Sequence, residues 1–163
     1  MSRVVAGAIA AQILSAIVPE LKITAFTQAI GKIELPQDYT EFDLSEANID
    51  SNDVRCPHPE TARRMEVSIL AARNAGDTVG GVIRCVVSGC PVGVGQPVFD
   101  KLSARLASAM MSINAAKGFQ IGDGFALASS LGSQVMDTWT DGDPGCHILH
   151  AAANHSGGIQ GGI

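Results

Sequence analysis

Three stretches of the chain carry apolar residues at the spacing of an amphipathic helix. In residues 2–18 one stripe is apolar and the polar residues fall largely outside it, which predicts a helix that ends before Pro19. Ser2 is expected to be its N-cap, because a serine oxygen can accept a free backbone N–H of the first turn. The apolar stripe consists of Val5, Ile9, Ile13 and Ile17.

Two further helices are predicted, over residues 60–74 and 101–113. Gly76 follows the first at the position where a C-cap glycine is favoured, and Asp100 is expected to cap the second. The positions expected to face inward are Ala62, Met65, Ile69 and Ala72 in the first helix, and Leu102, Leu106, Ala109 with Met110, and Ile113 in the second.

Residues 22–35 and 78–88 have the composition and alternation of strands. The first is expected to bulge or bend at Gly31, and the second to bury mainly the face that carries Val79, Ile83, Cys85 and Val87. After Asn114 we expect short β-like pieces that are interrupted by glycines. The order of elements predicts an α+β fold with a largely antiparallel sheet.

The remaining segments are polar or rich in glycine. Residues 36–59 form an acidic connection, for which a solvated surface excursion is favoured over a binding loop, and His58 is expected to be an exposed loop histidine. Residues 136–153 are expected to be irregular. For residues 154–163 a flexible tail is favoured over the alternative, a backbone that approaches a planar or anionic ligand.

Composition narrows the class of protein. A chain of 163 residues with 46% hydrophobic residues is expected to form one domain, and 4% aromatic residues imply an aliphatic core. The net charge of −5, without a basic cluster, argues against nucleic acid as a partner, and no apolar run has the length of a membrane span. Four cysteines without C-x-x-C spacing indicate free thiols in a reducing compartment, which favours the cytoplasm.

Most familiar catalytic patterns are missing from the chain. Residues 93–95 (GVG) match only half of a dinucleotide-binding fingerprint, so a structural loop is favoured there. Cys146, His147 and His150 lie too close together for a closed tetrahedral site, so no metal is expected. No G-x-S-x-G elbow or cysteine–base pair indicates a nucleophile, so no catalytic residue is assigned.

One turn remains a candidate binding element. Residues 114–118 (NAAKG) offer an amide, small residues and a cation directly after a helix. A ligand contact and an ordinary helix C-terminus are equally supported by these residues alone.

Six sequence motifs, which occur here in the same order as in the family, resemble the chorismate synthase family. They are residues 3–10 (RVVAGAIA), 55–60 (RCPHPE), 76–81 (GDTVGG), 91–101 (PVGVGQPVFDK), 111–125 (MSINAAKGFQIGDGF) and 154–163 (NHSGGIQGGI). The resemblance implies an α+β fold of β-α-β sandwich layers with a largely antiparallel sheet. It also implies a lyase of the shikimate pathway that removes phosphate from 5-enolpyruvylshikimate 3-phosphate to give chorismate. Members use reduced FMN and are typically homotetramers, and NADPH is a candidate source of electrons for the flavin.

The resemblance assigns Asn114, Ala115 and Gly161 to cofactor binding. The family's GESHG, SARET and RHDPC motifs, which lie in its flanking regions, do not occur here, nor does its second histidine-bearing segment. We therefore expect residues 1–163 to be the central portion of a single chorismate synthase domain, truncated at both ends and inactive alone. The alternative is a non-catalytic fragment, or a binding or assembly module, that retains part of the fold. A plastid location is the alternative to the cytoplasm if a targeting segment lies upstream.

Overall fold

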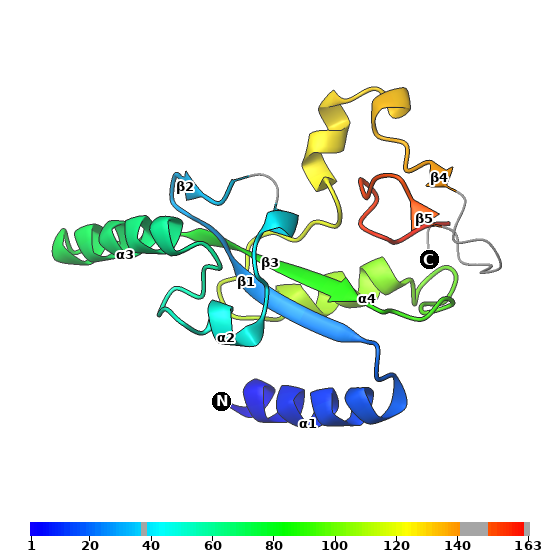
Figure 1. Cartoon of the computed structure of the whole chain (residues 1–163), viewed down its shortest axis with the longest axis horizontal. Helices are drawn as coiled ribbons and strands as arrows, with labels where there is room; N and C mark the ends of the chain where they lie inside the picture. Colours follow the sequence, from blue (N-terminus) through cyan, green and yellow to red (C-terminus); the bar gives the residue numbers. More distant parts are fainter. Residues whose placement is uncertain (37–38, 141–149, 162–163) are drawn as a thin grey trace. The chain divides into compact units, whose positions relative to one another are not determined.

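Two long antiparallel strands dominate the first half of the chain. In the computed structural model, which describes residues 1–36, 39–140 and 150–161, β1 (Lys22–Ile30) pairs with β3 (Gly81–Ser88) along its whole length. The two-residue strand β2 (Ile33–Glu34) pairs with the other edge of β1, so the order is β2-β1-β3 (Figure 1). Contacts divide the chain into two units, residues 1–91 and 92–163, and each is described by itself.

The chain bends at Gly31, as expected, but the bend is a full reversal, so residues 22–35 form two antiparallel strands rather than one. Gly31 has a φ of 57°, which glycine adopts without steric cost, and its N–H donates to the carbonyl of Gly80 at 2.9 Å. A separate irregularity in the ladder between β1 and β3 lies between Thr27 and Ala29. The segment is therefore a hairpin with a bulge in its longer strand.

The face of β3 that was expected to be buried is exposed. Ile83 and Val87 are 66% and 48% exposed, whereas Val86, on the opposite face, packs against the core. Phe26 of β1 pairs with Arg84 and shares the face of Val86. Alternation along a strand defines two faces but does not say which one another element will cover.

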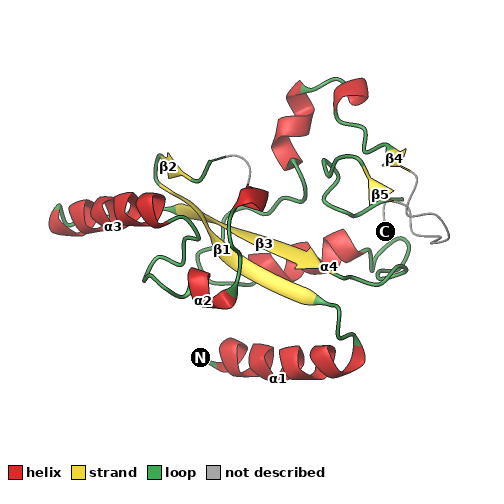
Figure 2. Cartoon of the chain, viewed as in Figure 1, coloured by secondary structure: helices red, strands yellow, loops and turns green. Residues whose placement is uncertain are grey.

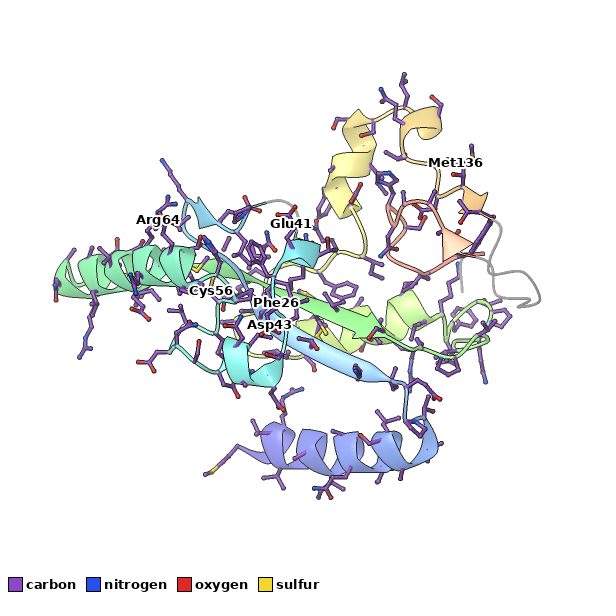
Figure 3. The ribbon with its side chains drawn as sticks, viewed as in Figure 1. Phe26, Glu41, Asp43, Cys56, Arg64 and Met136 are labelled. Carbon is purple, nitrogen blue, oxygen red and sulfur yellow. The ribbon has the colours of Figure 1, made fainter. Side chains whose placement is uncertain are left out.

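The acidic connection is exposed along much of its described length, as expected, but it also contributes buried side chains to the core. It contains a 3-10 turn (Tyr39–Glu41) and α2 (Glu46–Ile49), which Ser45 caps by accepting from the N–H of Asn48. Ile49 and Cys56 are each 1% exposed and pack in one cluster with Phe26; Figure 3 labels Phe26 and Cys56. The connection therefore supplies apolar side chains to the core of the first unit.

The same connection runs beside the bulge of β1. The N–H of Thr27 donates to the carbonyl of Arg55 at 3.0 Å, and its hydroxyl donates to the carbonyl of Val54 at 2.6 Å. These bonds satisfy polar groups of a buried residue, as a folded core requires.

Helix α3 (Pro59–Asn74) confirms the prediction most closely. Met65 is fully buried and Ala62 nearly so, and proline occupies the first turn, where its missing N–H costs nothing. At the C-terminus Gly76 has a φ of 69° and the N–H of Asp77 donates back to the carbonyl of Ala72, as in a glycine-terminated helix. The core of this unit consists of Phe26, Leu35, Ile49, Cys56, Ala62 and Met65.

The residue before this helix corrects another expectation. His58 is half-buried rather than an exposed loop residue. Its Nδ1 lies 2.8 Å from the hydroxyl of Thr61, and its ring centroid lies 5.3 Å from that of Phe42.

Helix α1 (Ser2–Ile17) is present, but its apolar stripe faces solvent in this chain. The four stripe residues are between 54% and 70% exposed, and the helix has no buried residue. Ser2 is the first helical residue rather than the N-cap, which is Met1. None of the helices in the described ranges is long and apolar enough to cross a membrane.

The second unit contains α4 (Leu102–Met111), two 3-10 helices (Gly124–Ser129 and Gly132–Gln134) and the short antiparallel pair β4 (Trp139–Thr140) and β5 (His150–Ala151) (Figure 2). The β-like pieces expected after Asn114 are wrong, since 3-10 turns form there. Residues 136–153 were expected to be irregular, and the short strand pair of β4 and β5 shows that this expectation is wrong where the pair forms. The candidate metal residues Cys146 and His147 lie outside the described residues.

Helix α4 differs from its prediction at both ends. It is shorter than expected, and Lys101 rather than Asp100 is the N-cap residue. The carboxylate of Asp100 instead pairs with Arg105 at 3.3 Å. None of the positions expected to face inward is buried in this chain.

Candidate functional site

Two glycine-bearing turns of the second unit touch backbone to backbone. The N–H of Asp123 donates to the carbonyl of His155 at 2.9 Å. A Cβ added at Gly157 would lie 2.5 Å from the backbone nitrogen of Gly122, and one added at Gly122 would overlap the carbonyl of His155. Only glycine permits this approach, so the flexible tail expected for residues 154–163 is wrong at this contact.

The carboxylate of Asp137 holds the same loop from another direction. Its Oδ1 accepts the N–H of His155 at 2.7 Å and its Oδ2 accepts the N–H of Ser156 at 2.8 Å. The side-chain amide of Gln160 also donates to Oδ2, at 3.4 Å. The N–H of Ser156 is the main cause that lowers the pKa of Asp137, with a smaller lowering from His155, because hydrogen bonds to the charged form favour it.

The side chain of His155 adds a third connection. Its Nδ1 lies 2.6 Å from Oδ2 of Asp123, and both side chains are partly exposed. Because a carboxylate only accepts, the ring N–H is the donor. His155 is therefore held through its N–H, its carbonyl and its ring.

Asn114 and Ala115 lie in a tight turn after α4. The N–H of Ala116 donates to the carbonyl of Ile113 at 3.2 Å, and Ala115, the third residue of the turn, has a φ of 66°. A positive φ at this position is typical of a type II turn, which usually carries glycine there. An alanine in this conformation costs roughly 1–2 kcal/mol. Both residues are exposed, so the turn presents a peptide group and an amide side chain to solvent.

Gly161, the third predicted residue, is also exposed and has a φ of 65°. A Cβ added there would meet nothing within 4 Å, so the backbone is open to an approaching group. Within the described residues no hydrogen bond joins Asn114 or Ala115 to Gly161, and their convergence on one ligand stays a prediction.

Asn114, Ala115 and Gly161 could contact one side of a planar, polar ligand, but these three residues do not enclose it. None of the three lines the hollow formed by Phe119, Gln120, Gly124 and Phe125, which has a volume of about 220 Å³. Sites that enclose a drug-sized ligand span roughly 300–1,000 Å³. The ranges that the structure describes contain no group of three potential metal ligands.

The sequence analysis missed Asp123 and Asp137. The sequence does offer a signal for Asp123, which stands between two glycines, Gly122 and Gly124. In the structure both glycines have positive φ. Asp137 carries none that we can identify, since its partners lie 18 and 19 positions away.

Together, the fold and the site define an α+β protein in which two glycine-bearing segments, residues 121–124 and 154–161, contact each other through their backbones. The chain belongs to the chorismate synthase family, whose model matches residues 1–163. Chorismate synthase from Christiangramia forsetii is 51% identical over 99% of this chain and 42% of its own length, and that from Bacteroides fragilis is 47% identical over 100% of this chain and 44% of its own. A solved structure described as "Crystal Structure of Chorismate Synthase" is 30% identical, with a TM-score of 0.78 over 91% of this chain and 46% of that one.

These comparisons confirm the family and the α+β fold that the resemblance implied. The chain spans 42–44% of the length of these two relatives.

Proposed function

We propose that this chain supplies the flavin-contacting part of a chorismate synthase. The reaction is the 1,4-elimination of phosphate from 5-enolpyruvylshikimate 3-phosphate to give chorismate, in the shikimate pathway, and it requires reduced FMN. The match of the family to all 163 residues carries this proposal. A cytoplasmic location, a homotetrameric assembly and NADPH as a reductant of the flavin are parts of the same proposal.

The residues of this chain bind and orient in this proposal rather than transfer a proton. Asn114 offers an amide that can donate and accept, and the turn presents the peptide group between Asn114 and Ala115. Gly161 lets the ligand approach the backbone because it has no side chain. Asn114, Ala115 and Gly161 would hold reduced FMN, which when bound would supply electron density to the C–O bond that breaks. No catalytic residue and no metal ligand is assigned.

The strained Ala115 supports the assignment of the turn. Ala115 shares positive φ with two other non-glycine residues in the described structure, Arg55 and Val98, and such residues cost free energy and are enriched where ligands are held. At an ordinary helix C-terminus, glycine would adopt positive φ at this position without the free-energy cost that alanine incurs.

A chimaera tests the proposed reaction directly. Residues 1–163 replace the 51% identical segment of the Christiangramia forsetii protein, and phosphate release from 5-enolpyruvylshikimate 3-phosphate is measured with reduced FMN. We expect turnover within about tenfold of the parent enzyme, which corresponds to roughly 1.4 kcal/mol in the barrier. A chimaera that folds and assembles like the parent but releases no phosphate would overturn the proposal.

Two substitutions in the chimaera test the residue assignment. Asn114→Ala is expected to weaken FMN binding by about tenfold, because an amide hydrogen bond to the ligand is lost. Lys117→Ala is the matched control, since it removes an exposed side chain from the same segment that we do not assign to the flavin. Equal FMN affinity in the two variants would remove Asn114 from the site.

The second candidate is a non-catalytic module that keeps part of the fold for binding or assembly. It predicts a chimaera that folds and releases no phosphate.

A further inference from the structure

We propose that Asp137 is a positioning residue that presents the glycine loop, residues 154–161, to the flavin. This inference rests on the proposed function, because Gly161 is the loop residue that is proposed to contact the cofactor. Asp137 acts through the loop and does not itself touch the ligand.

The geometry of the carboxylate supports this role. Each oxygen accepts one of two consecutive backbone N–H groups, those of His155 and Ser156, at 2.7 and 2.8 Å. Two bonds to adjacent peptide groups set the orientation of the backbone as well as its position. Bonds of this kind, with a charged acceptor, are about twice as strong as neutral ones.

The carboxylate also reaches the far end of the loop. Oδ2 accepts both the N–H of Ser156 and, at 3.4 Å, the side-chain amide of Gln160, the residue that precedes Gly161. One side chain therefore ties the start of the loop to the residue next to the proposed flavin contact. Gly157 and Gly158, which lie between these two points, both have positive φ and offer no side chains to stiffen the path.

Asp137 is unsuited to binding the flavin directly. Both of its oxygens are already used by donors of the protein, and its negative charge would repel the phosphate of FMN. A loss of flavin affinity on its substitution would therefore report the loop and not a lost ligand contact.

The contact of the loop with Asp123 limits how far substitution of Asp137 is expected to disturb the loop. The bonds that join His155 to Asp123, through its carbonyl and its ring, do not involve Asp137. We therefore expect Asp137→Ala to loosen and reorient residues 155–161 without unfolding the second unit. Asp137→Asn keeps one accepting oxygen and places an N–H₂ group opposite the other N–H, so its effect is expected to be as large or larger.

The test uses the 163-residue chain with two readouts. Amide hydrogen exchange of residues 155–157 reports the loop, and quenching of FMN fluorescence on titration reports binding. For both Asp137 variants we expect exchange at the two N–H groups to accelerate by about tenfold or more, and the Kd for FMN to rise by about tenfold. Asp100→Ala is the matched control, because it removes an exposed carboxylate of the same unit that pairs only with Arg105 in the described structure; it is expected to change neither readout.

The outcomes separate this inference from the proposed function. Unchanged exchange in the Asp137 variants overturns the inference. Faster exchange with unchanged FMN affinity also overturns it, since the role is then only structural. If the unsubstituted chain does not bind FMN, the proposed flavin contact of this chain fails, and the inference fails with it, whatever the exchange data show. Recovery of both readouts in the Asp137→Glu variant, which restores the two oxygens, would support the role of the carboxylate.

Discussion

The ring Nδ1 of His155 lies 2.6 Å from Oδ2 of Asp123, a residue 32 positions earlier in the chain. The same two residues are joined through their backbones, since the N–H of Asp123 donates to the carbonyl of His155. The turn at residues 121–124 and the loop at residues 154–161 therefore behave as one structural element. Glycine at positions 122 and 157 makes this contact possible.

Gly122→Ala is expected to destabilise the second unit. The new Cβ would overlap the carbonyl of His155, and alanine at a φ of 57° costs roughly 1–2 kcal/mol before that overlap is counted. We expect a loss of about 2 kcal/mol or more in the free energy of unfolding, measured in urea by the fluorescence of Trp139, the single tryptophan of the chain.

Gly118→Ala is the control for that experiment. A Cβ added at Gly118 would meet nothing within 4 Å, and its φ is not positive, so we expect a change within about 0.5 kcal/mol. Equal effects of the two substitutions would contradict the backbone contact.

The loop is expected to loosen in acid through Asp137. Its pKa is lowered in the folded state, chiefly by the N–H of Ser156, so the folded chain binds fewer protons than the unfolded chain in acid. The stabilisation is therefore present above the ordinary aspartate pKa of about 3.9 and is lost as the pH falls through the lowered value. Amide exchange of residues 155–156, corrected for its intrinsic pH dependence, should show this loss in the unsubstituted chain. An Asp137→Asn chain with the same acid response would show that another group is responsible.

Met65→Ala should destabilise the first unit. Met65 is fully buried on α3, so the truncation leaves a cavity and is expected to lower the free energy of unfolding by about 2–5 kcal/mol. Val67→Ala, on the same helix, truncates a side chain that is 67% exposed and should change it by less than about 0.5 kcal/mol. Urea titrations followed by far-ultraviolet circular dichroism measure both, and similar losses would contradict the assignment of the core.

The apolar stripe of α1 should be dispensable for the fold of this chain. Ile13 is 54% exposed, so Ile13→Glu is expected to change the free energy of unfolding by less than about 0.5 kcal/mol. It should also reduce self-association, because it interrupts an exposed apolar surface. Light scattering after gel filtration measures association. Gln12→Glu adds the same charge outside the stripe, so an equal reduction in that variant would mean that charge alone is responsible.

The 163-residue chain alone is expected to release no phosphate from 5-enolpyruvylshikimate 3-phosphate with reduced FMN. The family's GESHG, SARET and RHDPC motifs, which lie in its flanking regions, do not occur in these residues, and no catalytic residue is assigned to residues 1–163. A phosphate assay with the parent enzyme as positive control makes the measurement. Turnover by the purified chain would refute this expectation.

Several features could be predicted because they depend on neighbouring residues. The inward residues of α3 follow from helical spacing, and Met65 is indeed buried. Membership of the family could be predicted from six sequence motifs and their order along the chain. Other predictions failed where a distant element decided the outcome: the exposed face of β3 carries Ile83 because the core lies on the side of Phe26, and Ile49 is buried although its segment is acidic.

The sequence by itself determined the main helices, the antiparallel α+β class and the family. Periodicity, turn residues and short sequence motifs are properties of local stretches, and the order of the motifs is read directly along the chain. Only the tertiary structure decided that residues 154–158 are held rather than free, and that Asp137 holds them. The bonds from His155 and Ser156 to Asp137 cross 18 and 19 positions. Whether such partners meet depends on the path of all the residues between them, which no local pattern encodes.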